Sequence, residues 1–274
     1  MKVVIKLGGS VIVEKHRNWF PTSIEEITTL GKEYIRYGVL KRLCKEISQV
    51  IGKEDFLFLV NGAGIFGHYL VNYYFNNKDF DVLTIHRSVS FLNSEVVKTL
   101  KDFGLKVKTI HPFESCKFTK NGFDVDKLLK SLTFPGFFSS YGDIIPTVGL
   151  KGRLEKYEII SGDDLIVKVS EVLKPERLIV VTDVDGVYTK DPKIFKDAER
   201  IKVIDPLNPK FIDYSNYGID VTGGMKSKVE KLSKLAINGI ESQIISGLIP
   251  GNLRRALSGD KTVGTLIKIS TPLK

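Results

Sequence analysis

The opening stretch KVVIKLGGS, residues 2–10, constrains the fold of this chain more than any other segment. Residues 3–5 are three consecutive β-branched residues, which predict a buried strand of a parallel sheet. The strand ends at Gly8 and Gly9, where the missing Cβ lets the backbone turn tightly and approach a ligand closely. A helix after this turn would direct backbone N–H groups at an anion. Lys6 lies two residues before Gly8, so its ammonium group either emerges at the same place or extends into solvent from the strand end.

A second apolar strand, predicted over residues 56–60, runs into another glycine-rich segment. Residues 61–68 read NGAGIFGH and contain G-x-G-x-x-G, the pattern typical of dinucleotide-binding proteins. Those proteins also place an acidic residue at the end of the next strand. Asp81 precedes the apolar run 82–85 instead of ending it, which disfavours a nicotinamide site. We therefore expect the glycines to cradle a phosphate, with His68 donating an N–H to it from the first turn of the following helix.

The remainder of the first half alternates between helix and strand patterns. Hydrophobic periodicity predicts helices over residues 24–50, 86–100 and 122–132. A strand is predicted over residues 106–110. The basic stretch 151–156 is expected to connect the two halves of the chain.

In the second half, aspartates stand at two element boundaries. Asp163 and Asp164 precede an apolar helix, so one of them is a natural N-cap and the other is left to orient nearby lysines. The strand predicted over residues 178–182 runs into D-x-D-G. We expect both carboxylates of that turn, Asp183 and Asp185, to face the C-terminal edge of the sheet, where ligands bind.

The helix that follows Gly224 carries one lysine in an unusual position. By the 3.6-residue period, Lys228 projects between the directions of Leu232 and Leu235, toward the core. A lysine at such a place needs an anion. The other lysines of this helix are expected in solvent, and they are Lys226, Lys231 and Lys234. Further strands are predicted over residues 243–246 and 264–267.

Repeated strand–glycine–helix units predict an α/β protein with an open, mainly parallel sheet and helices on both faces. The sequence contains no Walker A pattern and no H-R-D or D-F-G set of the protein kinases. Phosphoryl transfer nevertheless fits the pattern, because it needs mainly positioning and cations around the phosphate oxygens. The residues that we expect to supply these are Lys6, Lys15, His68 and Lys228, with Asp163 holding the lysines.

Composition narrows the possible partners. The formal net charge is +9 with the basic residues spread along the chain, which suits anionic small substrates. No aromatic-basic motif supports nucleic-acid binding. No apolar run reaches bilayer-spanning length, no signal-peptide pattern opens the chain, and Cys44 and Cys116 form neither a metal spacing nor a disulfide framework. We expect a cytoplasmic protein that binds neither a membrane nor a nucleic acid.

Several motifs together resemble the amino acid kinase superfamily. They are KLGGS at 6–10, GDD at 162–164, TDVDGVYTKDPK at 182–193 and DVTGGM at 220–225. The resemblance covers nearly the whole chain in order. It implies a three-layer αβα sandwich formed by a single domain, 1–274. It also implies a lobe for the phosphate acceptor (1–156), a lobe for ATP and Mg²⁺ (157–274) and a homodimer.

Within that superfamily the chain resembles the isopentenyl phosphate kinases. The matching features are G-x-F-G-H at 64–68, Lys15, His86-Arg87, Tyr141-Gly142-Asp143 and the form DVTGGM. The resemblance implies that His68 binds the acceptor phosphate, that Lys6 and Lys15 support the transferring phosphoryl group, and that Asp163 orients these lysines. It implies direct phosphorylation of isopentenyl phosphate by ATP.

From these motifs we expect the acceptor to contact Ala63, His68 and Gly142. The residues expected to bind ATP are Lys6, Gly8, Gly9, Ser10, Gly64, Asp183, Tyr188, Gly224 and Lys228; no protein metal ligand is expected. Apolar residues near Val82, Ile85 and Val89 are candidates for the wall of the alkyl pocket. Two alternatives stay open: a kinase for another small phosphate or phosphonate, because Asn61, Ala63 and Ile65 depart from the family pattern, and a non-catalytic nucleotide sensor.

Overall fold

The computed structural model describes residues 1–14, 23–67, 70–71, 82–149, 152–208, 212–214 and 224–270. Its central sheet consists of β1 (Lys2–Leu7), β2 (Phe56–Asn61), β3 (Lys108–Thr109), β6 (Gly136–Tyr141), β9 (Arg177–Thr182), β12 (Val203–Ile204), β13 (Ser242–Ser246) and β14 (Thr265–Ile267). The strand order is β12-β14-β13-β9-β1-β2-β6-β3. The neighbouring strands are parallel except β13 and β14, which are antiparallel. Strands of both halves of the chain thus meet at β1.

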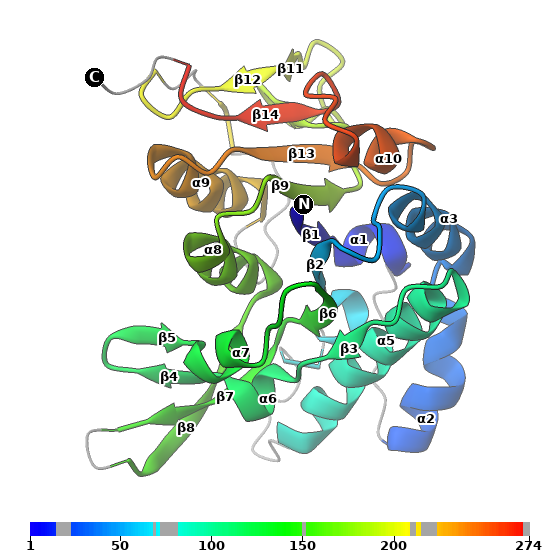
Figure 1. The fold of residues 1–274 in the computed structure, drawn as a ribbon, viewed down its shortest axis with the longest axis vertical. Coiled ribbons are helices and arrows are strands. Elements are labelled where there is room, and N and C mark those ends of the chain that lie inside the picture. Colours follow the sequence, from blue (N-terminus) through cyan, green and yellow to red (C-terminus); the bar gives the residue numbers. More distant parts are fainter. Residues whose placement is uncertain are drawn as a thin grey trace.

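Two hydrophobic cores lie on opposite faces of this sheet, because side chains alternate along each strand. On β1, Val3, Ile5 and Leu7 belong to the core shared with α1 (Gly9–Ile12), α3 (Tyr37–Ser48), α5 (Val82–Asp102) and α10 (Asn252–Leu257). Val4 belongs to the opposite core, shared with α8 (Gly162–Leu173) and α9 (Gly224–Ile237). Figure 1 shows these two groups of helices on the two sides of the sheet. The predicted three-layer αβα sandwich with a mainly parallel sheet is confirmed.

Smaller elements complete the fold. A second sheet has the order β5-β4-β7-β8, with β4 (Lys117–Thr119), β5 (Gly122–Asp124), β7 (Asp143–Val148) and β8 (Leu154–Ile160). A two-stranded sheet pairs β10 (Val187–Tyr188) with β11 (Arg200–Ile201). The short helices are α2 (Ile24–Thr29), α6 (Pro112–Ser115) and α7 (Asp126–Lys130), and the 3₁₀ helices are η1 (Leu30–Tyr34) and η2 (Gly64–Phe66).

Several predicted boundaries differ from the structure. The single helix expected over 24–50 is three helices: the 3₁₀ helix η1 follows α2 directly, and the backbone becomes extended at Ile35 before α3 begins. Helix α5 begins at Val82 rather than residue 86, so the apolar run 82–85 is helical and not a strand. The strand expected over 106–110 is only Lys108–Thr109.

The helix predicted over 122–132 is also wrong in its first part. Gly122–Asp124 is strand β5, and only Asp126–Lys130 is helical. Of the basic stretch 151–156, the last residues belong to strand β8, which pairs with β7 in the same half of the chain. Among the described residues, both cysteines are buried free thiols, and the helices are too short or too polar to cross a bilayer.

Candidate functional site

A cavity of about 780 Å³ opens where β1, β2 and β9 end, at the C-terminal edge of the central sheet. Most of the residues predicted from the sequence line it. They are Lys6, Gly8, Gly9, Ser10, Ala63, Gly64, Gly142, Asp163, Asp183, Gly224 and Lys228. Tyr188 is not among the lining residues. Lys15, His68 and Asp81 lie outside the described residues, as does the DVTG part of the motif at 220–225.

Lys6 reaches this cavity because of the strand periodicity. Lys6 lies two residues after Val4 on β1, so both side chains point to the face of the sheet that α8 and α9 cover. Its neighbours across the sheet in register are Val60 on β2 and Val180 on β9, which belong to the core on that same face. A lysine in such an apolar setting requires a counter-ion.

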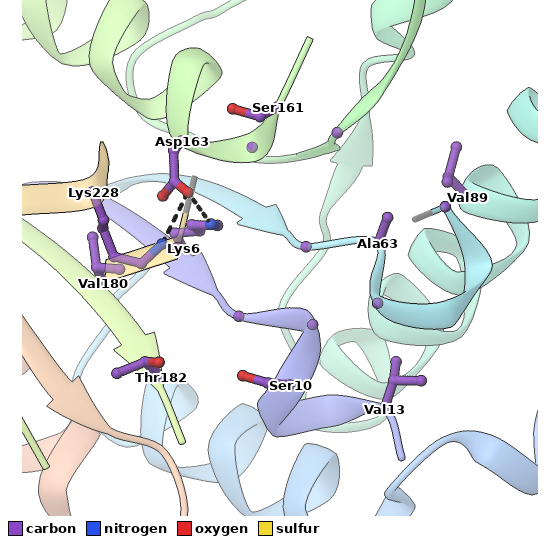
Figure 2. Close-up of a pocket in the computed structure, with 18 of the residues that line it drawn as sticks. Lys6, Ser10, Val13, Ala63, Val89, Ser161, Asp163, Val180, Thr182 and Lys228 are labelled. Atoms are coloured by element: carbon purple, nitrogen blue, oxygen red, sulfur yellow. Dashed lines mark hydrogen bonds and ion pairs between the residues drawn. The ribbon is translucent and has the colours of Figure 1, made fainter. Parts of the chain in front are cut away.

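Asp163 is that counter-ion, and it serves two lysines. Its Oδ2 lies 2.7 Å from Lys6 Nζ and 3.0 Å from Lys228 Nζ. The exposed fractions of the side chains are only 6% for Asp163, 10% for Lys6 and 12% for Lys228. Figure 2 shows the carboxylate pointing down from α8 toward both ammonium groups. Lys228 therefore lies on the core side of α9, as predicted, and meets a lysine from the other half of the chain.

The electrostatics of this trio favour an anionic ligand. Burial opposes the charged form of Asp163, but Lys6 and Lys228 outweigh it and hold the pKa of the carboxyl well below its usual range. Asp163 is therefore ionised at neutral pH. Two ammonium groups share this one carboxylate, so the trio itself carries one net positive charge, and ammonium groups bind phosphate oxygens through charge-assisted hydrogen bonds.

Two glycine-rich turns touch each other beside these lysines. A Cβ on Gly9 would lie 2.5 Å from the backbone N of Gly64, and a Cβ on Gly62 would lie 2.6 Å from the backbone N of Gly9. The turns are anchored to the sheet by hydrogen bonds from Gly8 N to Val181 O (2.8 Å) and from Gly62 N to Leu7 O (2.7 Å). Only glycine allows this contact, which brings two sets of backbone N–H groups to one side of the cavity.

The D-x-D-G turn after β9 contributes one carboxylate, not two. Asp183 lines the cavity, where its Oδ1 accepts from Ser10 Oγ (3.2 Å) and its Oδ2 lies 2.7 Å from Lys193 Nζ. Asp185 is not a lining residue. It accepts instead from the hydroxyl of Tyr188 (2.5 Å), within the same turn. The expectation that both carboxylates face the ligand edge is therefore wrong for Asp185.

Sequence reasoning also missed two lysines and one cap. Lys231, expected in solvent, lines the cavity and lies 2.7 Å from Asp164 Oδ1, and Lys193 lines it as well. The prediction that Asp163 or Asp164 is the N-cap is wrong: the N-cap of α8 is Ser161, whose hydroxyl accepts from Asp164 N, while Asp164 completes a capping box from inside the helix. The S-x-x-D spacing in residues 161–164 was the signal for that cap. Asp163 takes no part in this capping box.

The opposite end of the cavity is apolar. Ile85 and Val89 on α5 line it together with Val71, Ile144 and Ile159. Val82 is not a lining residue; it packs against the small core cluster formed by Leu70, Val71, Ile85 and Ile144. In Figure 2, Val89 lies beyond the turn that carries Ala63, on the side away from Asp163. The cavity thus combines a cationic end with a hydrocarbon-lined end.

The three departures from the family pattern have different surroundings. Asn61 is buried behind the cavity, where its Oδ1 accepts from Asn93 Nδ2 (2.7 Å), and it acts there as a structural hydrogen-bond partner. Ala63 and Ile65 line the cavity. The described residues hold no group of three or more His, Cys, Asp or Glu side chains placed to bind a metal ion.

Comparisons with known proteins identify the family of this chain. The model of the amino acid kinase family matches residues 1–246. The isopentenyl phosphate kinase of Methanothermobacter thermautotrophicus is 33% identical over 97% of this chain and 98% of its own length. That of Methanocaldococcus jannaschii is 30% identical over 98% of this chain and 100% of its own length. An X-ray structure of isopentenyl phosphate kinase aligns with a TM-score of 0.75 at 30% identity, covering 98% of this chain and 100% of that chain. The chain therefore belongs to the amino acid kinase family and, within it, to the isopentenyl phosphate kinases.

Proposed function

We propose that this protein transfers the terminal phosphoryl group of ATP to isopentenyl phosphate, giving isopentenyl diphosphate and ADP. The observation that carries the proposal is the two-ended cavity. Its cationic end holds Lys6 and Lys228 on one carboxylate, beside two glycine turns, and its other end is lined by aliphatic side chains. An alkyl phosphate has the matching polarity. The isopentenyl phosphate kinases among the full-length relatives support the same choice.

The proposed roles follow from position. Lys6 would neutralise charge on the phosphoryl group in transit, because it lines the same cavity as the two glycine turns. Lys228 and the backbone N–H groups of Gly9 and Gly64 would hold the nucleotide phosphates. Asp163 would position both lysines rather than react. A phosphate oxygen of the acceptor attacks the terminal phosphorus of ATP directly, and the bond to the ADP oxygen breaks in line.

The remaining assignments rest on family resemblance. Lys15 would assist Lys6, and His68 would bind the acceptor phosphate. Asp183, Gly224 and Tyr188 would contribute to nucleotide binding, and Gly142 to acceptor binding. Mg²⁺ enters as part of the nucleotide substrate, because it binds phosphate oxygens and retains several waters instead of requiring an all-protein cage. The homodimer and the cytoplasmic location stay predictions.

Phosphorus NMR of the protein with ATP, Mg²⁺ and isopentenyl phosphate tests the reaction. We expect the acceptor signal to be replaced by the two doublets of a diphosphate monoester while ADP accumulates. The same measurement with ethyl phosphate and with methylphosphonate tests the alternative acceptors. Turnover of one of these, but not of isopentenyl phosphate, would replace the proposed acceptor. Tight ATP binding without turnover of any acceptor would support the nucleotide sensor and overturn the proposal.

A further inference from the structure

A buried histidine–aspartate contact joins two elements at the apolar end of the cavity. His86 on α5 and Asp143 at the start of β7 approach with 2.9 Å between Nδ1 and Oδ2. The Asp143 side chain is completely buried. When the Asp143 carboxyl is ionised it only accepts hydrogen bonds, and Nδ1 of His86 is then the donor of this contact. Asp143 also accepts from the backbone N of Phe113 on α6 and from that of Ile144.

The sequence neighbours of this pair form two walls of the cavity. Ile85 precedes His86 on α5, and Ile144 follows Asp143 on β7. Both isoleucines line the cavity, and both belong to the small core cluster at its apolar end. The contact between His86 and Asp143 therefore joins the backbones that carry the two walls, one residue away from each.

Aromatic packing fixes the imidazole in place. The ring of His86 lies against Phe113, with 4.6 Å between centroids, and Phe113 stacks on Tyr157 at 6.0 Å. Phe113 and Tyr157 pack against the same small cluster as the isoleucines. These ring contacts hold His86 against Phe113, with Nδ1 toward Asp143.

Electrostatics make the carboxylate dependent on this partner. Burial raises the pKa of Asp143, while the hydrogen bond from His86 and the backbone N–H groups oppose the rise. Without His86, a completely buried carboxylate would lose its side-chain partner. The segment would then rearrange or the carboxyl would take up a proton.

We propose that His86 and Asp143 are positioning residues that hold the two apolar walls at the separation required by the hydrocarbon of the acceptor. This inference rests on the proposed function, since it concerns the acceptor end of the same cavity. It predicts an effect on the acceptor and on alkyl selectivity, with none on the nucleotide.

Two substitutions of His86 provide the test. In His86→Asn the amide nitrogen is bonded to Cγ, as Nδ1 is, so a donor to Asp143 is kept. In His86→Gln the amide lies one bond further out, so the donor is misplaced. We expect His86→Gln to raise the KM for isopentenyl phosphate about tenfold, as for loss of a charged hydrogen bond. Its KM for ATP should stay within about twofold, and His86→Asn should restore most of the acceptor affinity.

The selectivity between acceptors distinguishes misplaced cavity walls from a general loss of stability. The preference of kcat/KM for isopentenyl phosphate over ethyl phosphate should fall in His86→Gln and return in His86→Asn. Tyr37→Phe is the matched control. It removes the hydrogen bond from Tyr37 on α3 to Glu95 Oε2 (2.7 Å), and Glu95 lies on α5 as His86 does. Neither Tyr37 nor Glu95 lines the cavity. The control should leave the preference unchanged.

The outcomes separate this inference from the proposed function. A wild-type protein that does not phosphorylate isopentenyl phosphate overturns both. With an active wild type, an unchanged KM for the acceptor in His86→Gln overturns the inference alone. Equal rises in the KM values for ATP and acceptor, or an asparagine variant no better than the glutamine variant, also overturn it.

Discussion

At the scale of single residues, the site depends on three largely buried charged side chains, those of Lys6, Asp163 and Lys228. Lys6 and Lys228 come from different halves of the chain and share one oxygen of Asp163. The attraction between buried charges compensates for lost hydration only while every member is present. Asp163 is therefore the residue whose removal disturbs this balance most, because both ammonium groups would lose the carboxylate that they share.

Replacing Asp163 with asparagine should lower both stability and activity. We expect the free energy of unfolding to fall by about 3 kcal/mol, as for other broken buried pairs, and kcat to fall by at least about tenfold because the lysines lose their orientation. Urea unfolding and initial rates measure the two effects. Asp124→Asn is the control, since it removes a partly exposed pair with Lys117 and should cost less than about 1 kcal/mol.

The difference in unfolding free energy between the wild type and Asp163→Asn should depend on pH, because the pKa of Asp163 is lowered in the folded protein. In the unfolded chain the carboxyl titrates near its ordinary pKa of about 4. Its contribution to stability is therefore complete above about pH 4 and is lost as the pH falls toward the lower folded value. The gap in unfolding free energy between wild type and Asp163→Asn should be constant near neutrality and shrink below about pH 4. A gap that grows in acid would contradict the charged pair.

Helical periodicity predicted the position of Lys228 and failed for Lys231. The period gives the direction of a side chain around its own helix axis. It placed Lys228 toward the core, as the structure has it. It contains no information on a carboxylate that another helix presents, so it could not place Lys231 beside Asp164. Pairings between distant elements are the part of a site that a single sequence does not specify.

At the scale of elements, the cavity depends on two turns whose backbones are in contact. Gly9→Ala should disrupt them, because its Cβ would lie 2.5 Å from a backbone nitrogen of the neighbouring turn. We expect the KM for ATP to rise and kcat/KM to fall by at least about tenfold, since the N–H groups of both turns shift. Gly38→Ala is the control, because a Cβ there has open space around it in helix α3. Retained activity in Gly9→Ala would show that the turns separate freely.

Element prediction was accurate for β1, β2 and β9 of the central sheet, missed β6 and β12 of that sheet, and was poor at the second sheet. Strands β1, β2 and β9 are buried on both faces, so each is a continuous apolar run with no competing pattern. Strands β4 and β5 are only partly buried, and their residues show no such run. The overlooked signal was Asn121-Gly122, a typical hairpin dipeptide, at the connection between these strands.

At the scale of the whole molecule, the two halves of the chain share one sheet. Strand β1 pairs with β2 of the first half on one side and with β9 of the second half on the other. The division into lobes at residues 156 and 157 stays a prediction. A boundary there would assign β1 and β9 to different lobes although the two strands are paired. No local pattern indicates which strands become neighbours, because strand order is set by contacts distant in the sequence. The order is therefore known from the structure.

A shared sheet predicts that the molecule unfolds as one unit. Without β9, the fragment 1–156 would leave one edge of β1 unpaired and expose the apolar faces that α8 and α9 cover. We expect this fragment to remain unfolded, and the full chain to unfold in a single transition seen alike by far-ultraviolet and near-ultraviolet circular dichroism. A non-hydrolysable ATP analogue at about one hundred times its Kd should stabilise that transition by about 2.7 kcal/mol. Because the nucleotide would contact Lys6 on β1 and Lys228 on α9, the whole transition should move together. Two transitions of which the analogue moves only one would show that the lobes are independent.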